Sequence, residues 1–277
     1  MRNFVFLFFL IITLSLFPVA RHQEFQEEEE ETQDQIEEVI DYHYNGNIKI
    51  KGQMKNDQKH GIWKEWHLDG EKKSEKEYLE GKKQGQWKEW HENGKMKSKI
   101  DYQDDEYHGS WVEWYYTGGK KSSKYYNNGV PQGRWTEWDE NGNTTHVINF
   151  FEDGDKKFEI HLEYTREGTI KTYQEWFESG NKRLEQQMKN DIKHGYYKEW
   201  FEDGVLSIET QYNEGKEHGL HRDYYPNGQI RMEIEKQDGK KHGRATFWNE
   251  QGLKQWIKVY LDDQYVRSEN IYEQNCP

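Results

Sequence analysis

Acidic residues recur in one register of this chain, at a spacing that is almost always 24 residues. Carboxylates in such a row could bind a metal ion or act as general acids and bases. If each 24-residue unit supplies two strands, however, successive carboxylates lie about 10 Å apart, whereas the ligands of one cation must each come within about 2.6 Å of it. We therefore interpret the row as a solvated or salt-bridged ladder. Its members are Asp41, Glu65, Glu89, Glu113, Glu137, Glu175, Glu199 and Asp223.

A second ladder places a histidine immediately before a glycine, as in His60-Gly61. The same spacing prevents two such imidazoles from sharing a zinc ion, whose ligands lie at about 2.1 Å. We interpret His-Gly as part of the turn between hairpins. The chain also lacks GxSxG, HExxH and phosphate-binding glycine motifs, so we expect no catalytic, cofactor-binding or metal-binding residues. The histidines of this ladder are His60, His108, His194, His218 and His242.

Both ladders belong to a repeat that carries an aromatic residue at position five, counted from zero, and a glycine at position nine. The residue before that glycine is often Asn or Asp, as in Asp69-Gly70, which is typical of a two-residue hairpin turn. We therefore predict an all-β fold, an elongated antiparallel single-layer sheet or open solenoid of about nine tandem hairpins. The copies begin at Glu37, Gly61, Gly85, Gly109, Gly133, Lys171, Gly195, Gly219 and Gly243.

A two-residue turn at positions eight and nine predicts which residues lie opposite each other. Gly61 would face Tyr78, Trp63 would face Lys76, and Trp66 would face Lys73. One face would then pack aromatic rings over glycines and form the core. The other would alternate aromatic and basic residues and stay solvated. From this second face we take a candidate partner-binding surface: Trp66, Trp90, Trp114, Trp138, Trp176, Trp200, Lys73, Lys97, Lys121 and Arg183.

The repeat is interrupted once, because Lys171 follows Gly133 by 38 residues. We expect copies one to five over residues 37–156 and copies six to nine over residues 171–266, with a tail at 267–277. Residues 157–170 form an extra half unit, where we expect a bulge, a kink or an orphan strand.

The N-terminal residues suggest export. An apolar run from Phe4 to Phe17 follows Arg2 and precedes small residues near Ala20, which predicts a signal peptide over residues 1–20. The protein would then be secreted or periplasmic; an uncleaved signal anchor that tethers it to the membrane is the alternative. Residues 21–36 are acidic and are expected to form a disordered linker. The net charge of −13 argues against nucleic acid as a partner, and a single cysteine, Cys276, excludes disulfides within the chain.

Copies of the form GxWxEWxxNGxxxxxxxYxxG resemble the MORN-repeat-variant family. The resemblance covers residues 37–263 and is most specific over residues 63–70, 87–94 and 135–142. It implies hairpin arrays and protein-binding roles, and many members of the family are labelled as antitoxins of toxin–antitoxin pairs.

We expect a non-catalytic, exported scaffold that binds another protein and needs no cofactor. Cell-envelope glycan or anionic lipid is the alternative ligand, since aromatic rows can stack on sugars and basic residues can bind head groups. An antitoxin-like role as the partner of a toxin is a further alternative. The sequence leaves the oligomeric state open.

Overall fold

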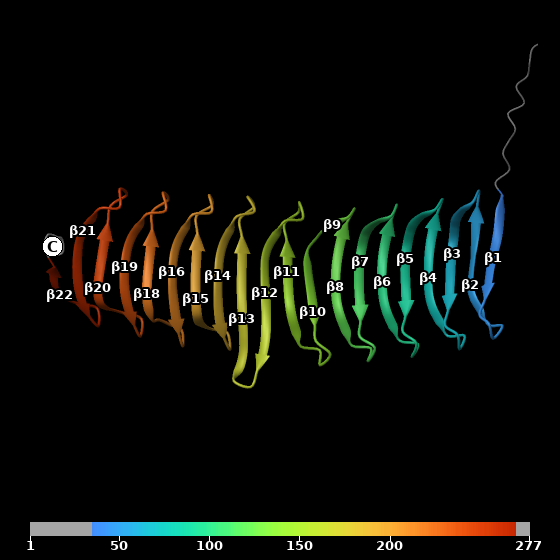
Figure 1. Cartoon of the computed structure of the whole chain (residues 1–277), viewed down its shortest axis with the longest axis horizontal. Coiled ribbons are helices and arrows are strands. Elements are labelled where there is room, and N and C mark those ends of the chain that lie inside the picture. The colour runs from blue at the N-terminus through green and yellow to red at the C-terminus, as the bar shows by residue number, and fades with distance from the viewer. Residues whose placement is uncertain (1–34, 270–277) are drawn as a thin grey trace, which may run out of the picture. The chain divides into compact units, whose positions relative to one another are not determined.

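The computed structural model describes residues 35–269, which form one open antiparallel sheet of 22 strands (Figure 1). The strands are β1 (Ile36–Tyr42), β2 (Ile48–Lys55), β3 (Gln58–Trp66), β4 (Lys72–Leu79), β5 (Lys82–Trp90), β6 (Met96–Gln103), β7 (Glu106–Trp114), β8 (Lys120–Asn127), β9 (Val130–Pro131), β10 (Arg134–Trp138), β11 (Thr144–Phe150), β12 (Lys156–Thr165), β13 (Gly168–Trp176), β14 (Lys182–Lys189), β15 (Ile192–Trp200), β16 (Leu206–Asn213), β17 (Lys216–Glu217), β18 (Gly219–Tyr224), β19 (Ile230–Gln237), β20 (Lys240–Trp248), β21 (Lys254–Leu261) and β22 (Gln264–Glu269).

Strands pair in the order of the sequence, and at two places in the sheet a strand is divided into two segments. β9 and β10 both pair with β8, and β17 and β18 both pair with β16. The prediction of an all-β, single-layer array of hairpins is therefore confirmed. In the part of the chain that the structure describes, no helix is long and apolar enough to cross a membrane.

The segments predicted before and after the repeat array lie wholly or partly outside the described residues. The signal peptide predicted for residues 1–20 lies outside them, as do residues 21–34 of the predicted linker. Strand β1 begins at Ile36, within the span given to that linker, and β22 extends to Glu269, within the span given to the tail.

The hairpin loop within each copy has three residues, so the predicted two-residue turn is wrong. In the copy that begins at Gly61, the amide of His67 donates to the carbonyl of Glu71 at 2.8 Å, and the amide of Gly70 donates to the carbonyl of His67 at 3.0 Å. Gly70 has a φ of 92°, the left-handed conformation that closes a three-residue loop. Asp-Gly suits this loop as well as it suits a two-residue turn, so the dipeptide alone did not distinguish them.

The two-residue turns lie between copies instead. Asn56 and Asp57 have φ angles of 49° and 61°, and the flanking Lys55 and Gln58 pair directly. Two positive φ angles match the twist of adjoining strands, as in a type I′ turn. His60-Gly61 is part of strand β3, so the prediction that His-Gly makes this turn is also wrong. Gly61, with a φ of 67°, lies where the pairing of β2 with β3 shifts.

Away from the loop, the predicted register is confirmed. Gly61 pairs with Tyr78, and Trp63 pairs with Lys76. Side chains alternate between the two faces of a strand, so each face can be named by one residue. The Trp87 face carries Trp63, Trp87, Trp111 and Trp135, and the Trp90 face carries Trp66, Trp90, Trp114 and Trp138.

The aromatic residues of the Trp87 face form a continuous ladder of ring contacts in the first half of the sheet. Ring centroids lie 5.1 Å apart for Tyr78 and Trp87, and 4.8 Å apart for Trp87 and Tyr102. The ladder continues to Phe150, whose ring is 4.6 Å from Trp135. Large rings that pack side by side can stabilise a sheet without a second layer.

Trp63 shows how these rings fit the backbone. Its side chain covers Gly52, where an added Cβ would lie 2.3 Å from the ring. Its indole N–H donates to the carbonyl of Gln53 at 3.1 Å. Trp87 and Trp135 make the same bond to the strand before them. In these three copies the tryptophan at position two contributes both its ring and its N–H, whereas the indole N–H of Trp111 has no hydrogen-bond partner among the described residues.

Residues 157–170 do not produce a bulge or kink; they supply most of β12, the turn after it and the start of β13. Strand β12 pairs with β11 on one side and with β13 on the other. The change begins at β11, because a second three-residue loop, closed by Gly154, follows this strand. One extra strand reverses the direction of every later copy: β3, β5 and β7 point down in Figure 1, whereas β13 and β15 point up.

Reversed direction requires reversed faces. Successive copies are added along the long axis of the sheet, which is perpendicular to the strands. A copy whose strands are reversed but which is still added in the same direction is rotated by half a turn about this axis. The rotation exchanges the two faces of the sheet. The pairing shows the exchange directly, because Trp135 pairs with Ile148, Ile148 with Glu159, and Glu159 with Gln174. Gln174 neighbours Tyr173, which therefore lies on the opposite face from Trp135 although both occupy position two.

Candidate binding surface

The six predicted surface tryptophans do not share one face. Trp66, Trp90, Trp114 and Trp138 lie on the Trp90 face, whereas Trp176 and Trp200 lie on the Trp87 face because they follow the extra strand. All six side chains are half-buried. The sequence places them in one register, but two strands, β11 and β12, lie between Trp138 and Trp176 where regular copies have one, and this divides them into two groups.

The predicted pairing of these tryptophans with position-twelve cations is wrong. Trp66 pairs with Lys72, since the three-residue loop shifts the register by one residue beyond Glu65. Lys73 forms an ion pair with Glu65 at 3.3 Å, and Lys97 forms one with Glu89 at 3.4 Å. Arg183 reaches Glu175 at 2.8 Å, while the Nζ atom of Lys121 lies 6.0 Å from the ring of Tyr115.

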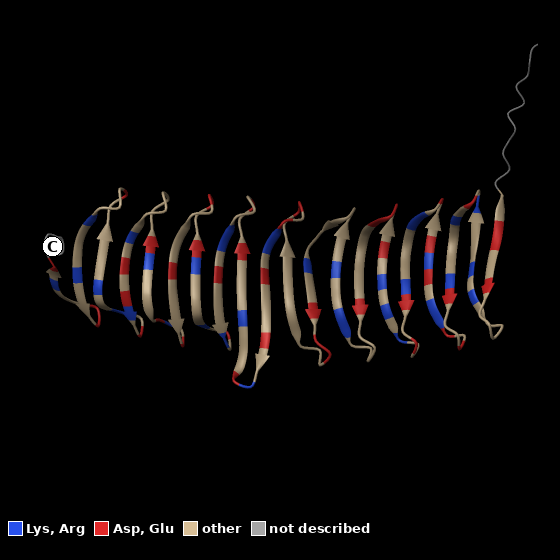
Figure 2. Cartoon of the chain, viewed as in Figure 1, with Lys and Arg blue, Asp and Glu red and all other residues tan. Residues whose placement is uncertain are grey.

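These contacts explain the acidic ladder, which is salt-bridged in several copies (Figure 2). Burial opposes ionisation of Glu89, but Lys76 and Lys97 outweigh it and lower the pKa of this carboxyl. The hydrogen bond from His221, together with Arg231, lowers the pKa of Asp223. Acidic side chains at position four therefore form ion pairs with basic residues of the sheet itself.

A lysine does contact the ring of position five, but it comes from the preceding copy. Lys72 lies 5.0 Å from the ring of Trp90 and bonds to Glu75 at 3.2 Å. In a later copy, Lys182 lies 5.5 Å from the ring of Trp200 and bonds to Glu185 at 2.7 Å. Lys156 and Glu159 repeat the arrangement around Trp176. This unit lies on the Trp90 face before the extra strand and on the Trp87 face after it.

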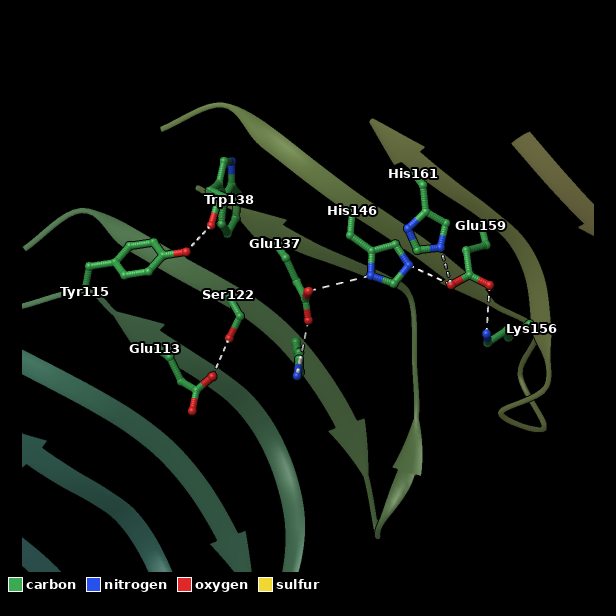
Figure 3. Close-up of polar contacts among 10 residues, drawn as sticks. Glu113, Tyr115, Ser122, Glu137, Trp138, His146, Lys156, Glu159 and His161 are labelled. Carbon is green, nitrogen blue, oxygen red and sulfur yellow. Dashed lines mark hydrogen bonds and ion pairs between the residues drawn. The ribbon is translucent and has the colours of Figure 1, made fainter. Parts of the chain in front are cut away.

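The backbone of the position-five tryptophan is also tied to its neighbour. The Nε2 atom of His43 lies 3.0 Å from the carbonyl oxygen of Trp66. In a later copy, the hydroxyl of Tyr115 donates to the carbonyl of Trp138 at 2.7 Å (Figure 3). Such bonds hold successive tryptophans in line along the sheet.

On the Trp87 face, ion pairs replace the aromatic ladder after the extra strand. Arg222 donates to Glu209 at 2.8 Å and to Glu233 at 2.7 Å, across two strand boundaries. Burial and a hydrogen bond to Glu209 raise the pKa of Tyr224 to about 12. One face of the sheet therefore presents two different surfaces, aromatic and then charged.

The join between these surfaces carries a polar cluster of two histidines and two glutamates (Figure 3). The Nε2 atom of His146 lies 2.6 Å from Oε1 of Glu159, and Nε2 of His161 lies 3.1 Å from the same oxygen. Glu137 approaches Nδ1 of His146 at 3.6 Å. Burial opposes ionisation of Glu159, but its bonds with Lys156 and His146 outweigh burial and lower its pKa.

The sequence did not lead us to this cluster, because His146 and His161 belong to neither periodic ladder. Two signals were present. Glu159 and His161 are two residues apart on a strand and so share a face. The loop residues Phe151–Gly154 match Phe201–Gly204, which marks β12 as the second strand of a hairpin and brings it beside His146.

An open antiparallel sheet of tandem hairpins, with one Trp and one ion-paired acid in fixed register in most copies, defines a β-hairpin repeat protein. The sequence model of the MORN repeat variant family matches residues 59–80, 83–104, 193–214 and 217–235, two copies on each side of the extra strand. The chain therefore contains repeats of the MORN variant, which are commonly non-catalytic modules. No curated protein matches the chain.

Proposed function

We propose that this chain is a non-catalytic, exported scaffold that binds an acidic protein through the Trp90 face of residues 61–138. The observation that supports this most is the row of Trp66, Trp90, Trp114 and Trp138, which no second layer of described residues covers. Export rests on the apolar segment at residues 4–17. The six predicted tryptophans thereby reduce to the four that share a face.

Apolar residues on the same face support a protein as the ligand. Ile62 is 52% exposed and Tyr125 is 51% exposed, and both point to the side of Trp66 and Trp114. These residues add apolar contact area beside Trp66 and Trp114, and tryptophan supplies much of the binding energy where it occurs in protein interfaces.

The charge pattern around Trp90 indicates the kind of partner. Lys88 and Lys99 lie directly opposite each other on β5 and β6. Like charges in this position destabilise a sheet. Glu75 approaches Lys88 at 3.7 Å, whereas Lys99 has only the more distant carboxylate of Asp101 and forms no ion pair within 4 Å among the described residues. A carboxylate from a partner would relieve the repulsion, so we expect an acidic binding segment.

Other predicted ligands have weaker support. Lys73, Lys97 and Arg183 are held by glutamates of their own copies, which leaves them less free to bind anionic lipid. A glycan could stack on the tryptophans, but it would not neutralise the Lys88–Lys99 pair. A toxin that presents an acidic segment would satisfy the proposal.

The test compares two double variants in capture of partners from the native extract. Trp90→Ala with Trp114→Ala should lower capture of at least one acidic protein by roughly 30-fold, since two buried anchors contribute about 2 kcal/mol or more. Trp176→Ala with Trp200→Ala removes the same repeat positions from the opposite face and should leave capture unchanged. Quantitative mass spectrometry gives both values.

Equal capture by the two double variants would contradict the proposal. Retention of the wild-type chain on purified envelope glycan or on anionic vesicles, with no protein captured, would favour the alternative ligands.

A further inference from the structure

The polar cluster at the join of the two surfaces has the composition of a metal site. His146 on β11 pairs directly with His161 on β12, and Glu159 lies two residues before His161 on the same face. The two imidazole rings stack at 4.1 Å with an angle of 16°. Both Nε2 atoms point to one carboxylate oxygen of Glu159 (Figure 3).

The three ligand atoms are close enough to converge on one ion. One atom each from His146, Glu159 and His161 lies within 4.8 Å of the others. A tetrahedral zinc ion, with ligands at about 2.1 Å, holds them about 3.4 Å apart. His161 is 55% exposed, so its side chain can rotate to close this difference.

The surroundings suit such an ion. Glu137 lies beside Nδ1 of His146 at 3.6 Å, where a carboxylate orients a ligating imidazole. Lys156 holds the second oxygen of Glu159 at 2.8 Å, so the first oxygen faces only the two imidazoles that would bind the ion with it. The Glu159 side chain is only 9% exposed, whereas His161 borders a surface hollow that Leu162 and Thr172 also line. An ion here would be held from within the sheet and open to the hollow.

We propose that His146, Glu159 and His161 form a site for a divalent transition metal of the zinc type. Two imidazoles and one carboxylate favour such ions over Ca²⁺ and Mg²⁺, which prefer oxygen ligands. The ion takes the place of the protons by which the Nε2 atoms of His146 and His161 bond to Glu159. Each neutral imidazole then carries its hydrogen on Nδ1, and His146 donates this hydrogen to Glu137. This departs from our expectation of no metal site, which considered the two periodic ladders. Here the ligands lie on adjacent strands rather than in successive copies.

The site would tie β11 to β12 where the repeat changes direction. Because the metal binds only the folded sheet, it should raise the melting temperature of the chain. This role is independent of the Trp90 face, so the two proposals stand or fall separately.

Zinc titration of the untagged, metal-free full chain tests the proposal. Calorimetry should give one equivalent of bound Zn²⁺, accompanied by a rise in melting temperature. His161→Ala should weaken binding at least tenfold and abolish the rise, because it removes an exposed ligand at little cost to packing. Glu137→Gln should weaken binding by about tenfold through the orientation of His146.

His218→Ala is the matched control, since it removes an exposed histidine outside the cluster. It should bind zinc as the wild type does. Absence of saturable binding by the wild type would overturn the proposal, as would unchanged affinity in His161→Ala. Circular dichroism before titration confirms that each variant is folded.

Discussion

Deletion of residues 157–170 should give a folded sheet in which all copies point the same way. The deletion restores a spacing of 24 residues between Gly133 and Lys171 and leaves Glu152-Asp153 where a two-residue turn is needed. It removes one strand, so the faces no longer exchange. Trp176 and Trp200 then join Trp66, Trp90, Trp114 and Trp138 on one face.

A disulfide reports this change. In regular copies, position thirteen pairs with position four of the next copy, as Ser98 does with Glu113. The deletion should bring His146→Cys and Glu175→Cys into this relation, in a background where Cys276 is replaced by serine. In the intact chain β12 separates these two residues by about 10 Å, beyond the reach of a disulfide.

Oxidation should therefore link the two cysteines in the deletion variant and leave them free in the intact chain, as measured by thiol counting. A folded deletion variant that fails to cross-link would show that the extra strand does not set the direction of the later copies.

Ile234→Ala should lower the free energy of unfolding by about 2–4 kcal/mol, a large effect for one residue of a single-layer sheet. Ile234 is 1% exposed and lies between His221 and Ala245, which is fully buried. Few side chains of this sheet are so completely covered, because no second layer of described residues packs on it. The cavity left by alanine can close only by movement of neighbouring strands.

Denaturant unfolding followed by circular dichroism measures the change. Ile192→Ala is the control, since Ile192 is 53% exposed, and it should alter stability by less than about 0.5 kcal/mol. Similar losses in the two variants would mean that Ile234 is not part of the core. In a repeat protein each copy depends on its neighbours, so the Ile234 variant should lose structure first around β18 to β20.

Much of the fold follows from the repeat itself. Gly61 opposite Tyr78 and Trp63 opposite Lys76 were predictable because the aromatic-over-glycine pattern fixes the register of a hairpin. The loop was not predictable from Asp69-Gly70, because a glycine with positive φ closes both two-residue and three-residue loops. Because the loop has three residues and not two, Trp66 pairs with Lys72, and Lys73 forms its ion pair with Glu65.

The candidate surface was predictable in its residue types but not in its placement. Trp90 and Trp176 share a register in the sequence, and only the number of intervening strands decides whether they share a face. An insertion of about half a repeat suggests one added strand, and one added strand exchanges the faces. The proximity of the metal-site residues was not predicted for a related reason, because they become neighbours only when β12 pairs with β11.

The pairing of β12 with β13 tests the exchange of faces most directly, because a slip of one residue would move every later side chain to the other face. In the intact chain with Cys276 replaced by serine, Leu162→Cys is combined with Lys171→Cys or with Thr172→Cys. Leu162 pairs with Lys171, and Thr172 points to the opposite face. Oxidation should link the 162–171 pair and leave the 162–172 pair free, whereas the reverse result would contradict the inverted arrangement.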